Sequence, residues 1–197
     1  MKNLILTIKK GSLVVAVLAS LISNANDISN LKDNTKIEKT ALTLNNVKAG
    51  NILTIKNLDG TTIYKEAIKI SGTYRKGFDL TLLPDGAYVF EVDKDLEVQT
   101  IPFKILKNVV FMNKAEETTT FKPYVKKSND MIYVTKLAPK MEALTISIYS
   151  DEAGLELLHS EVVSGVQAIE KVYKLKKGSY KFVFKTNDKE FTEFINN

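Results

Sequence analysis

The chain has 197 residues, of which 44% are hydrophobic and 26% are charged. These fractions are typical of a globular protein and exclude an intrinsically disordered chain. One apolar run approaches membrane length and lies at the N-terminus, which excludes a polytopic membrane protein. The formal net charge is +5, but it falls to +2 without residues 1–25, and Arg75 is the only arginine. This balance lacks the clustered basic surface of a nucleic-acid-binding protein, so we predict no nucleic-acid partner.

The N-terminus has the organisation of a secretory signal peptide. The first ten residues contain three lysines, and residues 13–22 (LVVAVLASLI) then form an apolar run with one serine. Ser-Asn-Ala at 23–25 then places small residues at the −3 and −1 positions of a cleavage site before Asn26. We predict a signal peptide over residues 1–25, with an uncleaved N-terminal anchor as the alternative. Residues 26–40 are polar and are predicted to form a leader.

The chain contains no cysteine and no Asn-x-Ser/Thr sequon. A lipoprotein signal needs a cysteine at the cleavage site, so lipoprotein anchoring is excluded and no disulfide can form. Small secreted eukaryotic domains usually carry disulfides or glycans. We therefore predict an exported bacterial protein, located in the periplasm, at the cell surface or outside the cell.

Beyond residue 40 the sequence predicts strands and tight turns, beginning with a first unit over residues 41–107. Asp-Gly at 59–60 and Pro-Asp-Gly at 84–86 are turn sequences, and the first of them predicts a β-hairpin. Gly72 is predicted to mark a loop. The alternating apolar residues of 78–82 then predict the next strand.

A second unit, over residues 118–197, repeats this order, with an offset of 92 residues across the stretch that begins at Gly86 and Gly178. The clearest match is the pattern Gly-x-Tyr-x-Phe-x-(Val/Phe), which occurs at 86–92 and at 178–184. Other predicted counterparts are Gly60 and Gly154, Tyr64 and Leu158, and Gly72 and Gly165. Self-similarity at a fixed period predicts a repeated structural unit.

Each unit has about seven strand signals with turn sequences every 8–12 residues, which is typical of a β-sandwich. Polar residues alternate with the apolar ones, as in sheets with one packed and one solvated face. We predict an all-β protein of two tandem Ig-like antiparallel β-sandwich domains after the signal peptide. The boundary is predicted near residues 107–117. There, segments 109–112 and 118–126 flank a polar turn and form either a long hairpin or the junction.

Residues 51–105 resemble the small Ig-like β-sandwich modules of secreted Bacteroidota proteins, among them the C-terminal sorting domains of type IX secretion. The matching residues are Asp59, Gly60, Leu83, Gly86 and Tyr88 in the first unit and Leu175, Gly178 and Tyr180 in the second. The resemblance implies a secreted β-sandwich present in two degenerate copies, and a type IX cargo with a sorting-type C-terminal domain is one functional alternative. Glu193 stands where a sorting domain carries a lysine, which favours a stand-alone tandem.

The sequence lacks the residue sets that enzymes and metal sites use. His159 is the only histidine, and without cysteine it has no partner for a His-based zinc site or a Cys–His pair. No Walker loop, dinucleotide fingerprint or Gly-x-Ser-x-Gly elbow occurs. We predict no enzymatic activity and no catalytic, cofactor-binding or metal-ligating residues. We interpret His159 as a structural or surface histidine.

Two kinds of charged segment have alternative interpretations. Asp93, Asp95 and Glu97 alternate and could ligate calcium, or they could belong to a solvated turn. The lysine pairs at 126–127 and 176–177 are interpreted as turn residues or as protection of sheet edges, because lysine on an edge discourages strand addition.

We predict an exported, non-enzymatic interaction or structural protein of a bacterial envelope. Its partner would be a protein or a surface glycan, bound through sheet edges and through loops at residues 72–76 and 165–168. Carbohydrate binding or surface capture is the alternative function, since Tyr64, Tyr74 and Tyr133 could be exposed for stacking on sugars. A membrane would be contacted only through an uncleaved signal segment.

Overall fold

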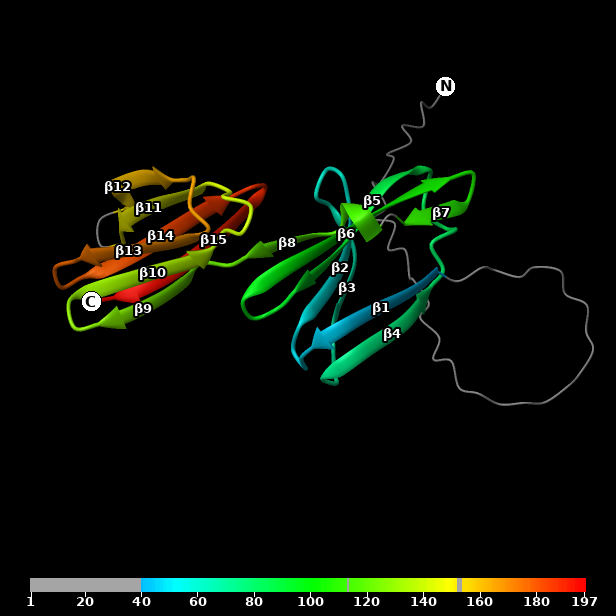
Figure 1. Ribbon diagram of the computed structural model, residues 1–197, viewed down its shortest axis with the longest axis horizontal. Coiled ribbons are helices and arrows are strands. Elements are labelled where there is room, and N and C mark those ends of the chain that lie inside the picture. The colour runs from blue at the N-terminus through cyan, green and yellow to red at the C-terminus, as the bar shows by residue number, and fades with distance from the viewer. Residues whose placement is uncertain (1–39, 113, 152–153) are drawn as a thin grey trace, which may run out of the picture.

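The computed structural model describes residues 40–112, 114–151 and 154–197 (Figure 1). Their regular structure consists of β-strands, joined in antiparallel ladders, and one short 3-10 helix, η1 (Lys114–Glu116). The predicted all-β fold class is confirmed. The predicted signal peptide and residues 26–39 of the predicted leader lie outside the described residues. Within the described ranges, no helix is long and apolar enough to cross a membrane.

The first unit consists of a six-stranded sheet, in which β8 joins the path β3-β2-β5-β6-β7 by pairing with β6, and a two-stranded sheet, β1-β4. Its strands are β1 (Thr40–Val47), β2 (Ile52–Asn57), β3 (Thr62–Ala67), β4 (Gly72–Phe78), β5 (Gly86–Asp93), β6 (Glu97–Leu106), β7 (Val109–Met112) and β8 (Thr118–Phe121). β2 and β3 form the hairpin predicted from Asp59-Gly60, and Gly60 adopts the positive φ that its turn requires.

The second unit consists of a four-stranded sheet, β12-β11-β14-β15, and a three-stranded sheet, β13-β10-β9. Its strands are β9 (Tyr124–Ser128), β10 (Met131–Leu137), β11 (Leu144–Ser150), β12 (Glu156–Val163), β13 (Ala168–Lys174), β14 (Ser179–Thr186) and β15 (Lys189–Asn196). The two units form separate groups of strands, joined through β8 (Figure 1).

The strand order of the first unit recurs in the second. The order β3-β2-β5-β6 matches β12-β11-β14-β15, and the pair β4-β1 matches β13-β10. Equivalent rows across three strands are Tyr64–Ile55–Phe90 and His159–Ile148–Phe182. The counterpart of Tyr64 is therefore His159 and not Leu158 as predicted, because the turn from β11 to β12 is longer than the turn from β2 to β3.

The same tyrosine contact fixes the start of one strand in each unit. The Tyr88 hydroxyl donates to the Pro84 carbonyl at 2.8 Å, and the Tyr180 hydroxyl donates to the Lys176 carbonyl at 3.0 Å. A tyrosine that bonds back to the turn before its own strand is a tyrosine corner, a feature of Ig-like sandwiches. The predicted Ig-like tandem is thus supported by an identical local contact in both copies.

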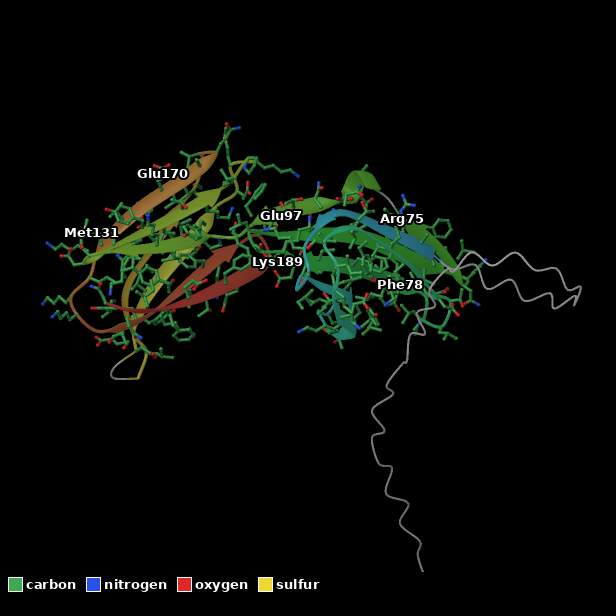
Figure 2. All side chains as sticks on the ribbon, turned by 90° about the horizontal axis from the view of Figure 1, so that it is seen from below. Arg75, Phe78, Glu97, Met131, Glu170 and Lys189 are labelled. Atoms are coloured by element: carbon green, nitrogen blue, oxygen red, sulfur yellow. The ribbon has the colours of Figure 1, made fainter. Side chains whose placement is uncertain are left out.

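Each unit has a core of its own between its two sheets. In the first core Phe90 lies between Phe78 and Phe103, with ring centroids 5.4 and 4.7 Å away. In the second core Phe182 and Phe184 are fully buried beside the aliphatic residues of β10 and β11. Figure 2 shows Phe78 within the first unit. Inward positions alternate along the strands, as the sequence pattern indicates.

Two predictions for the segment between β3 and β5 are wrong. Gly72 does not mark a loop but opens β4, and β4 ends at Phe78, so residues 79–82 form no strand. Asp79 ends the ladder because its carboxylate accepts hydrogen bonds from the backbone N–H and the hydroxyl of Thr81. Leu80 is buried in the turn that follows, whereas Leu82 is exposed.

The segment after β7 does not form the long hairpin that is one of the two predicted alternatives. β7 pairs with residues 103–106 of β6, and β8 pairs with residues 97–100 of the same strand. Pro102 lies between these stretches and has no N–H to donate to a ladder. The predicted second unit, starting at residue 118, therefore includes a strand of the first sheet, and the chain enters the second unit at 122–123. That each unit folds as an independent domain stays a prediction.

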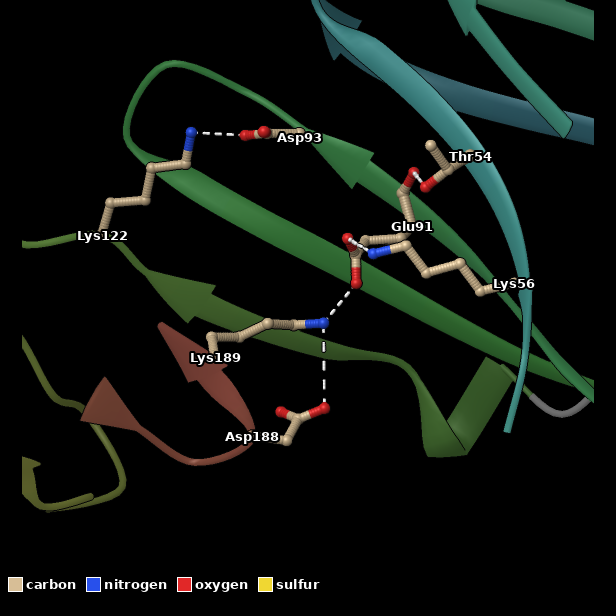
Figure 3. A network of polar contacts seen from close by, with 7 residues as sticks. All are labelled: Thr54, Lys56, Glu91, Asp93, Lys122, Asp188 and Lys189. Carbon is tan, nitrogen blue, oxygen red and sulfur yellow. Dashed lines mark hydrogen bonds and ion pairs between the residues drawn. The ribbon is translucent and has the colours of Figure 1, made fainter. Parts of the chain in front are cut away.

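A cluster of lysines and carboxylates joins the two units (Figure 3). Glu91 on β5 accepts from Lys56 at 2.6 Å and also pairs with Lys189, the first residue of β15. Lys122, at the passage between the units, pairs with Asp93. Burial opposes ionisation of Glu91, but hydrogen bonds from the two lysines outweigh it and hold its pKa below the ordinary value. Lys189 lies where the units meet (Figure 2).

Removal of the hydroxyl in Tyr88→Phe should lower the free energy of unfolding by about 1 kcal/mol, because one hydrogen bond from a buried side chain is lost. Tyr180→Phe removes the equivalent bond from a more exposed side chain and should cost less. Urea unfolding of both variants measures the difference. Equal stability of Tyr88→Phe and the parent chain would contradict a structural role for this contact.

Candidate functional site

The outer edge of β1 is the main difference between the two copies. In the described part of the chain β1 pairs with β4 alone, whereas its counterpart β10 pairs with β13 on one side and β9 on the other. The first unit thus lacks the strand that β9 provides in the second. The edge of β1 turned away from β4 has no ladder partner among these residues, and such an edge is a template for strand addition.

The side chains along β1 suit an added strand. Leu42 and Leu44 are buried in the core, while Ala41 and Thr43 are exposed on the outer face of the strand. No residue of β1 is charged. By contrast β9, the edge strand of the second unit's three-stranded sheet, carries the lysine pair at 126–127. Lysine disfavours further pairing on an edge, so β9 closes its sheet and β1 leaves its sheet open.

The apolar side chains that shield the two cores from solvent come from different strands in the two units. In the second unit Val125 of β9 packs against the core. In the first unit Val110 and Met112 of β7 take up this role from the opposite sheet. The first core is therefore already covered, and a strand added to β1 would contribute main-chain hydrogen bonds rather than fill a cavity.

A carboxylate and a lysine connect the two sheets at the same place in both units. Lys76 on β4 donates to Glu66 on β3 at 2.6 Å, and Lys171 on β13 pairs with Glu161 on β12 at 2.5 Å. Both glutamates and both lysines are 95 residues apart in sequence. The sequence analysis missed this pair, and the signal that could have found it is the recurrence of Glu and Lys at one common offset.

Aromatic and imidazole groups complete each of these clusters. In the first, Lys76 also donates to the Tyr64 hydroxyl at 2.6 Å, and the Tyr74 hydroxyl donates to Glu66. In the second, the Tyr173 hydroxyl donates to Glu161 at 2.6 Å, and the His159 ring nitrogen lies 3.3 Å from the same carboxylate. His159 is thus a partly exposed histidine beside a structural ion pair.

The two glutamates are held ionised. Burial alone would raise their pKa values, but the hydrogen bonds that Glu66 and Glu161 accept outweigh burial and lower them. For Glu161 the bonds from Lys171, Tyr173 and His159 bring the pKa to about 2. Burial and the neighbouring carboxylate raise the pKa of Tyr173. These shifts belong to ion pairs that close the sandwich rather than to a reactive group.

The carboxylates considered for calcium do not converge. Asp95 pairs with Lys48 at 2.7 Å, Glu97 pairs with Lys94 at 2.7 Å, and Asp93 pairs with a lysine at the passage between the units. Across residues 40–112, 114–151 and 154–197, no three acidic, histidine or cysteine side chains lie close enough to hold a metal.

The three tyrosines considered for sugar stacking differ in their exposure to solvent. Tyr64 and Tyr74 are partly buried against the first core and hydrogen-bonded, so the expectation that they are exposed is wrong. Tyr133 is exposed on the outer face of β10. Beside it Tyr124 of β9, which the sequence analysis did not single out, is 56% exposed. With Lys126 they line a shallow groove of about 380 Å³.

The two predicted binding loops have different outcomes. Residues 72–76 are not a loop, because they form the first part of β4. Their exposed Arg75 lies opposite Thr43 of β1, on the outer face of the two-stranded sheet. Residues 165–167 lie in the turn between β12 and β13, with Gly165 at positive φ, and Ala168 begins β13. Binding at this turn stays a prediction.

No family model and no curated protein sequence matches the chain. It is similar to the BSP domain of a biofilm-associated protein, with 14% identity and a TM-score of 0.28 over 81% of this chain and 27% of that one. It is also similar to the CD2-binding domain of CD58, with 13% identity and a TM-score of 0.26 over 80% and 91%. A third likeness, with 11% identity and a TM-score of 0.24 over 81% and 92%, is to the Pseudomonas aeruginosa CupB2 chaperone.

The chain thus spans about a quarter of the biofilm-associated structure. At these TM-scores the likenesses carry no functional argument. The resemblance to type IX sorting domains stays a prediction.

Glu161→Gln should lower the free energy of unfolding at neutral pH by on the order of 1–2 kcal/mol, after allowance for solvent screening. The pKa of Glu161 is about 2 in the folded chain and 4.5 as its ordinary value. Its stabilising effect is therefore complete above pH 4.5 and is lost as the pH falls toward 2. The difference between parent and variant, measured by chemical unfolding across this range, should shrink accordingly. Glu156→Gln, at an exposed residue of the same strand, is the control and should show no such change.

Proposed function

We propose that this chain is an exported, non-enzymatic interaction or structural protein of a bacterial envelope that binds a protein partner by strand addition. The bound segment of the partner would be an extended peptide that pairs with the outer edge of β1. The observation that carries this proposal is the internal comparison: β10 has β9 on the edge that stays unpaired in β1 within the described residues. Main-chain pairing of this kind is a common mode of peptide recognition.

Three features of β1 support this role. Its residues 40–44 pair in regular register with β4, before the register shift between Leu44 and Val47, and this regular stretch is long enough for a short added ladder. It carries no charged side chain, so it lacks the lysines that protect β9. Its buried residues, Leu42 and Leu44, fix which face of the strand is turned inward, so the register of an added strand would be defined.

Site-specific crosslinking tests the proposal. Because the chain has no cysteine, Thr43→Cys provides a single attachment point for a photoactivated crosslinker on β1. We expect a discrete crosslinked partner from envelope extract. Thr135→Cys is the matched control, since Thr135 is the counterpart of Thr43 on β10 and its strand is already paired on both sides. Crosslinking of equal yield from both positions, or from neither, would refute binding at the β1 edge.

Introduction of a lysine on the edge of β1 tests the same site without a crosslinker on that strand. Ala41→Lys should reduce capture of the crosslinked partner about tenfold, because lysine on a free edge disfavours pairing. Tyr133→Lys places the same group at the counterpart on β10 and should leave capture unchanged. Circular dichroism of both variants checks that the fold is retained.

A glycan-binding function is the second candidate, and the groove on β9 and β10 favours it. Tyr124 and Tyr133 expose their side chains beside Lys126 and Thr135, and exposed rings with polar neighbours suit stacking on a sugar. A glycan array probed with the parent chain and with Tyr133→Ala provides the test. Binding that is lost in Tyr133→Ala but kept in Tyr149→Ala would establish this function, and a blank array would refute it.

A further inference from the structure

Glu91 is a largely buried carboxylate on the outer face of the first unit's sheet. Its neighbours along β5, Phe90 and Val92, are buried in the core, so Glu91 points away from the core, beside Thr54 of β2. The outer face of such a sheet normally meets water. Here the Glu91 side chain is only 12% exposed, and it is paired with Lys189 of the second unit (Figure 3). The turn from β14 to β15 therefore reaches onto the first sheet.

The charges at this contact do not belong to the repeated architecture. At the offset of 92 residues Glu91 corresponds to Val183 and Lys189 corresponds to Glu97. Val183 is buried and apolar, and Glu97 pairs with Lys94 of its own turn. The ion pairs that connect the two sheets occur once in each unit, whereas this pair occurs where one unit meets the other. Its residues are therefore specific to the contact between the units.

The passage between the units is short and is held at several points. Two residues, Lys122 and Pro123, separate β8 from β9. The Lys122 backbone N–H donates to the Leu96 carbonyl at 2.9 Å, and its side chain pairs with Asp93. Pro123 is buried, and its ring fixes the backbone φ. This passage lacks the glycine and serine residues and the length of a flexible linker.

The carboxylate of Glu91 is shared between the units. Its Oε1 accepts a hydrogen bond from Lys56 of its own sheet, and its Oε2 accepts one from Lys189. Hydrogen bonds between two charged groups are the strongest that side chains form. Because both carboxylate oxygens are occupied, Glu91 is held in place by its own sheet and defines where the Lys189 ammonium group lies.

We propose that the two units form one rigid body, in which Lys189 with Glu91 and Lys122 with Asp93 fix the orientation of the second unit on the first. Linked units move relative to each other unless contacts between them prevent it. Two ion pairs, together with the passage itself, restrain both the distance and the rotation between the units. The edge of β1 and the groove beside Tyr133 are then held at a constant separation. This proposal is independent of which partner either surface binds.

The distance between two spin labels tests the proposal directly. The chain has no cysteine, so Thr43→Cys and Glu170→Cys place one label on each unit, both at exposed positions. Pulsed electron paramagnetic resonance on this doubly labelled chain should give one narrow distribution of distances. A broad distribution would overturn the proposal.

Removal of the two lysines tests which contacts restrain the units. Lys189→Met combined with Lys122→Met should broaden the distribution about twofold or more, because the units then turn about the passage. Lys185→Met is the matched control, since Lys185 is on the hairpin of β14 and β15 but pairs with Glu190 of its own unit. It should leave the distribution unchanged.

A conservative variant separates the ion pair from a general effect on the fold. Lys189→Arg should keep the narrow distribution, because a guanidinium also pairs with a carboxylate. Circular dichroism of all variants checks that the strands are retained. A folded double variant with the same width as the parent chain would overturn the proposal, as would equal broadening in Lys185→Met.

Discussion

Side chains hold the two sheets of each unit together, and the rest of the structure depends on this. No ladder among the described residues joins β1-β4 to the sheet of β2, or β13-β10-β9 to the sheet of β11. The chain has no cysteine, so no disulfide can replace such a ladder. Burial of aromatic rings such as Phe90 and Phe182 supplies the attraction, at roughly 1.5–3 kcal/mol for each fully buried large side chain. The contacts between the two sheets of each unit, and the positions of their edges and tyrosine corners, depend on the packing of these two cores.

At the rim of each sandwich an ion pair complements the core. Glu66 with Lys76, and Glu161 with Lys171, connect strands that belong to different sheets. Burial opposes ionisation of these carboxylates, but the hydrogen bonds from their lysine and tyrosine partners outweigh it and keep them ionised. Each ion pair therefore connects the two sheets at the same edge of the fold. The recurrence of this ion pair in both copies indicates that it belongs to the architecture of the unit and not to a binding site.

The binding edge proposed for β1 lies where the two copies differ. β1 has an open edge where β10 is covered, and β12 exposes apolar side chains where β3 carries a lysine. The edge of β1 offers main-chain pairing with a strand of another protein.

The sequence by itself determined the all-β class, the duplicated strand order and the hairpin at Gly60, because alternation and turn residues are local properties of the chain. It misplaced residues 78–82 because the side chain of Asp79 interrupts a regular apolar alternation. Only the tertiary structure decided that β8 completes the first sheet, that Tyr64 is partly buried against the first core and that β1 and β12 are edges. Those features depend on which strands lie side by side, and pairing between distant segments is set by the packing of the whole sandwich rather than by any one segment.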